Sequence, residues 1–101
     1  MVIEKVLSDL KNNPMVLLNP QNLEKLLDEV HIISEKDTLI SGYIRILKVD
    51  NLYITQETTD KNEIVLRLFR SEKEAKALVD DHLKTYEDMW NGCGCKINYY
   101  S

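Results

Sequence analysis

The sequence predicts an α+β domain, in which two or three helices cover one face of an antiparallel meander of three strands, with room for a fourth. The prediction rests on a change of period along the chain. Apolar residues recur at helical spacing up to residue 30, at every second position between 38 and 69, and at helical spacing again from 71 to 90. Amphipathic helices bury their apolar sides against a sheet. We therefore expect the order α-α-β-β-β-α, with a further β at the end, in one domain over residues 1–101.

Two helices are expected first, over residues 2–11 and from Asn19-Pro20 onward. Asn12-Asn13-Pro14 ends the first helix, because the residue before a proline avoids the α region. Residues 15–18 form a short extended connection. Asn19 suits a helix cap and Pro20 the first helical position, and the second helix is expected to fray near residues 31–33. The apolar stripes are Ile3, Val6, Leu7 and Leu10 in the first helix, and Leu23, Leu26, Leu27 and Val30 in the second.

Three strands are expected between Thr38 and Phe69. Alternation indicates the first strand, over residues 38–47. Asp50-Asn51 suits a hairpin turn, because both residues tolerate the left-handed conformation. Residues 52–57 then return, residues 58–62 turn again, and residues 63–69 form the third strand.

The last helix is the clearest element. Ser71 and Glu74 form a capping box at its start, and Asn91-Gly92 ends it. Charges alternate in sign along one side, which is typical of a solvated face. His82 lies on the other side, where we expect a satisfied core histidine rather than a ligand. The segment 96–100 would supply the fourth strand. The apolar stripe is Ala75, Leu78, Val79, His82, Leu83, Tyr86, Met89 and Trp90.

One face of the predicted sheet is unusual in composition. The helices are expected to cover Ile40, Ile44, Ile46, Ile54, Ile64, Leu66 and Leu68. The other face would then show Tyr43, Arg45, Leu47, Tyr53, Val65, Arg67 and Phe69. A solvated face should be polar, whereas Tyr, Phe and Arg are enriched in protein interfaces. We therefore expect another subunit, the segment 96–100 or the first helix to cover this face, and we favour a homodimer. The candidate interface residues are Tyr43, Arg45, Tyr53, Arg67 and Phe69.

The same face has an alternative interpretation as a ligand site. Arg45 and Arg67 could hold a small anion, a carboxylate or phosphate, over an aromatic floor, because a guanidinium offers bidentate hydrogen bonds. The competing explanation is that these arginines pair with Glu57 or Glu63. We favour the interface over the anionic ligand.

Both cysteines lie in the sequence Cys93-Gly94-Cys95, just after the last helix. Their spacing allows a disulfide only with strain unless the chain bends. The negative pole of the helix opposes the thiolate that redox chemistry requires. A metal site for Zn²⁺ or Cu(I) would need further ligands, and His31 is a candidate. We expect these cysteines to act as small packing residues and expect no cofactor, with zinc binding as the alternative.

Charge and motifs exclude several classes of function. The net charge is −4, and no basic stripe indicates nucleic-acid binding. The first residues do not read as a signal peptide and no apolar run could span a membrane, so we expect a cytoplasmic protein. No catalytic motif is present. We therefore predict a non-enzymatic binding or regulatory module that self-associates through its sheet. The alternative is a thiol protein that binds metal or performs redox chemistry at Cys93 and Cys95.

Overall fold

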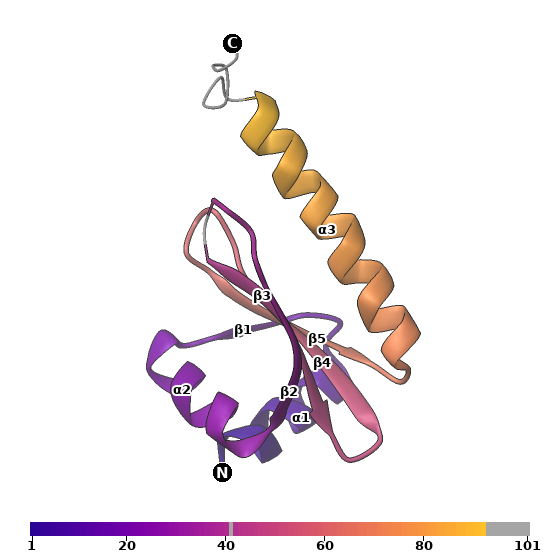
Figure 1. Cartoon of the computed structure of the whole chain (residues 1–101). Helices are drawn as coiled ribbons and strands as arrows, with labels where there is room; N and C mark the ends of the chain where they lie inside the picture. Colours follow the sequence, from indigo (N-terminus) through magenta and orange to yellow (C-terminus); the bar gives the residue numbers. More distant parts are fainter. Residues whose placement is uncertain (41, 93–101) are drawn as a thin grey trace.

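The computed structural model describes residues 1–40 and 42–92 and has an α+β fold, as predicted (Figure 1). The described elements follow the order α-β-α-β-β-β-β-α. Within the described residues, no helix combines the length and the apolar composition needed to cross a membrane. The helices are α1 (Val2–Asn12), α2 (Pro20–Glu29) and α3 (Glu72–Gly92), and the strands are β1 (Val16–Leu18), β2 (His31–Asp37), β3 (Tyr43–Val49), β4 (Leu52–Thr58) and β5 (Ile64–Phe69).

The sheet contains five strands in the order β1-β5-β4-β3-β2, and all its neighbours are antiparallel. The predicted meander corresponds to β3, β4 and β5. The prediction missed β1, which has only three residues, and β2, which was expected to begin as a frayed helix end. Strand β2 contains Glu35, Lys36 and Asp37, residue types with low strand propensity. Pairing with β3 rather than local preference makes this segment a strand.

Helices cover both faces of the sheet, so the expectation that they cover one face is wrong. Helices α1 and α2 lie on one side of the sheet and α3 lies on the other (Figure 1). The reason is the register between β3 and β4, in which Leu47 pairs with Ile54 and Ile46 pairs with Thr55. Cross-strand partners share a face. Both faces of the sheet therefore carry apolar residues, and both must be buried.

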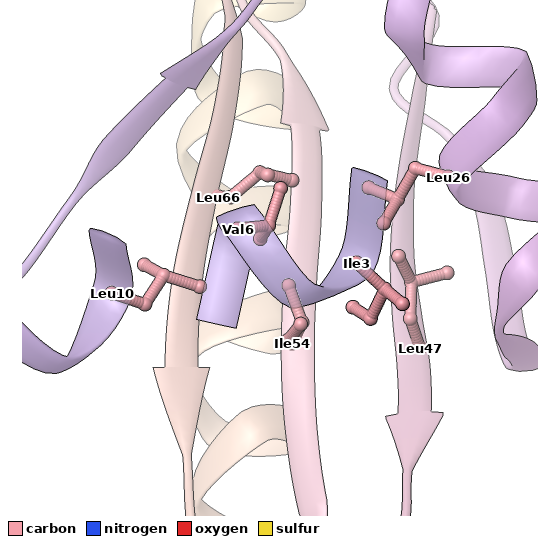
Figure 2. Close-up of a cluster of buried hydrophobic side chains, with 7 residues drawn as sticks. All are labelled: Ile3, Val6, Leu10, Leu26, Leu47, Ile54 and Leu66. Atoms are coloured by element: carbon pink, nitrogen blue, oxygen red, sulfur yellow. The ribbon is translucent and has the colours of Figure 1, made fainter. Parts of the chain in front are cut away.

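The larger core lies between the sheet and the helices α1 and α2 (Figure 2). Helix α1 has no side-chain cap of its own. Glu29 of α2 instead accepts hydrogen bonds from the backbone N–H groups of Ile3, at 2.8 Å, and Val2, at 3.4 Å. This contact joins the two helices and satisfies two of the free N–H groups at a helix start. The buried side chains of this core are Ile3, Val6, Leu10, Leu26, Leu47, Ile54 and Leu66.

The smaller core lies between the sheet and α3. Ala75 and Val79 of α3 are buried against Ile44 and Ile46 of β3. Ile33, Tyr53, Phe69 and Leu83 pack around them and are only partly buried. Ile40, which was expected to face the helices, is exposed in the β2–β3 connection.

The predicted turns and caps are largely confirmed. Asp50 adopts the left-handed conformation, with φ of 52°, in the predicted hairpin turn. Asn19 caps α2 by accepting from the Gln21 backbone N–H at 3.0 Å. Ser71 caps α3 by accepting from the Glu74 backbone N–H at 3.1 Å, and its hydroxyl donates to the Glu74 carboxylate at 3.1 Å. These local signals were readable because each depends on neighbouring residues alone.

Candidate functional site

A buried carboxylate lies between the sheet and the middle of α3. Glu57 of β4 is 5% exposed, and it is the one charged residue buried among those that the structure describes. The Tyr86 hydroxyl donates to Glu57 Oε2 at 2.5 Å. His82 Nδ1 lies 2.8 Å from Oε1, and Arg67 Nη1 lies 3.4 Å from the same oxygen. We call these four residues the Glu57 cluster.

The fold brings the Glu57 cluster together from three elements. His82 and Tyr86 are four residues apart on α3, so both side chains lie on the same side of the helix. Glu57 and Arg67 come from neighbouring strands, and the register places them on the face that α3 covers. A buried charge must be paired and hydrogen-bonded to be tolerated. The cluster meets this requirement for the Glu57 carboxylate with one cation and two further partners.

The Glu57 cluster has one feature in common with catalytic sites. A carboxylate that contacts one ring nitrogen of a histidine orients the ring, as in catalytic triads. A nucleophile beside the second ring nitrogen would complete such a site, and no described contact places one there. Among the described residues, no group of three or more His, Cys, Asp and Glu side chains is arranged to hold a metal ion. The contacts of His82 and Tyr86 with Glu57 join α3 to the sheet.

The five predicted interface residues do not share one face. Tyr43 and Arg45 lie on the side of α1 and α2, because they alternate with Leu47 along β3 and Leu47 belongs to the larger core. Tyr53, Arg67 and Phe69 lie on the side of α3, where Tyr53 and Phe69 pack against the smaller core. Tyr43 is 43% exposed. The expectation that these five residues form one open face is therefore wrong. The strand register places two of them on one face and three on the other, and α3 packs against the second group.

Both predicted anion-binding arginines have partners within the chain. Arg45 Nε lies 2.5 Å from the Glu35 carboxylate, and Nη1 donates to Gln56 Oε1 at 2.6 Å. Its guanidinium carbon also lies 5.0 Å from the centroid of the Tyr43 ring. Arg67 pairs with Glu57, which is one of the two partners considered from the sequence. These pairings use part of the donors of each guanidinium, and an anionic ligand remains an untested prediction.

Of the three candidate metal ligands, His31 alone lies among the described residues. His31 is exposed at the start of β2, where it pairs with Lys48. Cys93 and Cys95 lie outside the described residues, as does the expected fourth strand at 96–100. The metal site therefore stays a prediction.

A groove of about 640 Å³ lies between α1, β1 and α2. Its volume falls within the range of small-molecule sites. Val6, Val16 and Leu18 contribute apolar lining, whereas Lys5 and Lys25 contribute positive charge. Asp9 and Glu29 line the same groove, so the charges of the lining balance. The groove does not indicate a class of ligand.

The two edges of the sheet differ in chemistry. The β2 edge has exposed charges at Glu35, Lys36 and Asp37, and its pairing with β3 is interrupted between Ile32 and Ser34. The β1 edge has no charged residue, and Leu17 on it is 56% exposed. The whole segment 12–23, which contains β1, lacks charge in a chain that is 30% charged. The β1 edge is therefore the less protected of the two.

Sequence reasoning missed the Glu57 cluster as a unit. It placed His82 and Tyr86 on one side of the helix, and it expected a satisfied core histidine; His82 does have a partner in Glu57, but it is half-buried rather than part of the core. It considered Glu57 only as a partner for arginine. The spacing of His82 and Tyr86 on an otherwise apolar stripe was the available signal for a buried acceptor opposite them.

No family model matches this chain, and no curated protein or solved structure matches it either.

Proposed function

We propose that this chain is a binding module that self-associates by pairing β1 of one copy with β1 of a second copy. The observation that carries the proposal is the difference between the two sheet edges. The sequence predicted an interface on one face of the sheet. We propose the edge instead, because helices cover both faces. The interface would extend the five-stranded sheet of one copy into that of the other.

Unprotected edges favour strand pairing. A strand at the edge of a sheet has unpaired N–H and C=O groups, and natural proteins block such edges with charges or bulges. Strand β2 has both kinds of protection. Strand β1 has neither, although it is short and Pro14 and Pro20 flank it. Met15, just before β1, is 46% exposed and Leu17 is 56% exposed. Burying these side chains against a second copy would add to the backbone hydrogen bonds.

The uncharged segment 12–23 also suits pairing with itself. In a two-fold antiparallel pair centred on Leu17, Val16 lies opposite Leu18 and Met15 lies opposite Asn19, so no charges meet. The same arrangement on β2, centred on Lys36, would place Glu35 opposite Asp37. Like charges directly opposite each other are destabilising. Self-pairing is therefore compatible with β1 and disfavoured at β2.

The test is the oligomeric state of three proteins. We expect the wild-type chain to be a dimer at micromolar concentration in sedimentation equilibrium and light scattering. Leu17→Lys should raise the dissociation constant by about tenfold or more, because each interface would then hold two unpaired charges. Ile32→Lys is the matched control, since Ile32 is an exposed aliphatic residue in the opposite edge strand.

Circular dichroism should show that both variants keep the wild-type fold. A monomeric wild-type chain at about 100 µM would overturn the proposal, because a specific interface of ordinary size is expected to hold at that concentration. A dimer that both substitutions weaken equally would also overturn it, since the edge would then have no special role.

A further inference from the structure

His82 uses only one of its two ring nitrogens within the Glu57 cluster. Nδ1 lies 2.8 Å from Glu57 Oε1, and no hydrogen bond to a described residue uses Nε2. Among the described residues, Thr55 Oγ1 is the one buried side-chain polar atom without a partner. Nε2 also has no described partner, so it is not buried. Since the His82 side chain is 26% exposed, this nitrogen is open to solvent.

Glu57 fixes which nitrogen of His82 carries the proton. Its carboxylate also accepts from the Tyr86 hydroxyl and pairs with Arg67. An ionised carboxylate can only accept hydrogen bonds, so Nδ1 is protonated in the neutral ring and Nε2 keeps its lone pair. A carboxylate on Nδ1–H makes the other nitrogen more basic and stabilises the imidazolium that forms when it reacts. His82 therefore presents an oriented nucleophilic nitrogen to solvent.

Arg67 adds unused hydrogen-bond donors beside this nitrogen. Its guanidinium and the His82 ring contact the same oxygen of Glu57. The described contacts of Arg67 are Nη1 to Glu57 at 3.4 Å and Nη2 to the Met15 sulfur at 3.7 Å, and a thioether is a weak acceptor. Arginine binds phosphoryl oxygens through its parallel N–H groups. The guanidinium therefore favours an electrophile with anionic oxygens, which a phosphoryl group has and an acyl group lacks.

We propose that His82 is a phosphorylation site, which accepts a phosphoryl group on Nε2 from a donor of the phosphoramidate class. The Nε2 lone pair attacks phosphorus and forms a P–N bond. The P–N bond of the donor breaks, and the donor nitrogen, already protonated, leaves with the electron pair as a neutral amine. The ring becomes an imidazolium, whose Nδ1 proton stays hydrogen-bonded to Glu57. Arg67 offers its free N–H groups to the phosphoryl oxygens.

The second histidine of the chain provides an internal comparison. His31 is exposed, and no hydrogen bond among the described residues orients its ring. If exposure alone set the rate, His31 would react faster than His82. The proposal predicts the reverse order. It is separate from self-association through β1, because no residue of the Glu57 cluster belongs to that strand.

Labelling of the full chain with phosphoramidate at neutral pH tests the proposal. Fragmentation mass spectrometry would follow phosphoryl transfer to each histidine over time, and phosphorus NMR would identify the nitrogen modified. We expect His82 to be labelled on Nε2 about tenfold faster than His31, which is the factor expected for a hydrogen bond to a charged group. In urea that unfolds the chain, the two histidines should react at similar rates, because His82 then loses its contact with Glu57.

Glu57→Gln keeps the shape of the side chain and removes its charge. It should slow the labelling of His82 by about tenfold and leave His31 unchanged. Glu63→Gln is the matched control, because it removes an exposed carboxylate in the β4–β5 connection, and circular dichroism would compare the folds of both variants with that of the wild type.

Two results in the wild type would overturn the proposal, whether or not Glu57→Gln folds. One is a rate for His82 no higher than that for His31 in the native chain. The other is an advantage of His82 that persists in urea, since the local sequence and not the Glu57 cluster would then cause it. A folded Glu57→Gln variant that labels His82 at the wild-type rate would also overturn it.

Discussion

Glu29 stabilises a helix to which it does not belong, and this contact can be measured. The carboxylate accepts from the backbone N–H groups of Val2 and Ile3, which lie 27 and 26 residues away in the sequence. Helix α1 has no side-chain cap of its own. Glu29→Ala should therefore act as the removal of a helix cap, although the substituted residue lies at the end of α2.

The expected magnitude follows from this role. Loss of a cap costs about 1 kcal/mol in most proteins, and loss of a negative charge near a helix N-terminus costs about 0.3–1 kcal/mol. These two terms overlap, and Glu29 is exposed. We therefore expect the free energy of unfolding to fall by about 1 kcal/mol, which corresponds to a melting temperature about 4–8 °C lower for a domain of this size.

Urea unfolding at neutral pH is the measurement, with the midpoint and the slope fitted separately. Glu24→Ala is the matched control, because Glu24 is exposed on the same helix and its loss changes the net charge equally. Glu29→Gln keeps an acceptor oxygen and should lie between wild type and Glu29→Ala. Equal midpoints for Glu29→Ala and Glu24→Ala would refute the assignment of Glu29 as the cap of α1.

Three further predictions concern the cores, an ion pair and the cysteines. Leu66→Ala should lower the free energy of unfolding by about 2–5 kcal/mol, because Leu66 is fully buried. Leu83 is only partly buried, so Leu83→Ala should lower it by about 1–2 kcal/mol. A larger loss for Leu83→Ala than for Leu66→Ala in chemical denaturation would contradict this prediction. The hydrogen bond from Lys76, and then its charge, lower the pKa of Glu72. The stabilisation lost in Lys76→Gln should therefore be measurable by thermal unfolding at neutral pH and should vanish as the pH falls through the lowered pKa of Glu72. A difference that persists once Glu72 is protonated would exclude the ion pair as its cause. Substitution of both Cys93 and Cys95 by serine should lower the free energy of unfolding by about 1–3 kcal/mol. Native mass spectrometry of the wild type should show no retained zinc. One equivalent of zinc per chain that is lost in the variant would support the metal-binding alternative.

Local patterns were enough to predict most elements of this fold. The stripe of α3, its capping box and the Asn19 cap of α2 depend on residues within one or two helical turns. The hairpin at Asp50-Asn51 depends on two residues that tolerate a positive φ, and Asp50 adopts one. Strand β2 could not be predicted in the same way, because its strand conformation depends on hydrogen bonds to β3.

The candidate sites were harder to predict than the elements. The sequence indicated that Arg67 could pair with Glu57 and that His82 would have a partner, although His82 is half-buried and not in the core as expected. It did not indicate that one carboxylate serves both residues and Tyr86, because these contacts join positions 10 to 29 residues apart. The contrast between the two edges likewise required the strand order, since β1 was expected as a connection and β2 as part of a helix.

The sequence by itself determined which residues share a side within each strand and each helix, because those periods are properties of the backbone. Only the tertiary structure decided which helices cover which side of the sheet. The way in which the sides of β3 and β4 join was already implied by the predicted two-residue turn, because loop length sets the register of a hairpin. The two-residue loop at Asp50-Asn51 pairs Val49 with Leu52, and the same register places Leu47, not Ile46, beside Ile54. A shift of one residue moves every side chain of a strand to the other face. That single step separates a sheet with one open face from this sheet, which is apolar on both faces and buried between helices on each side.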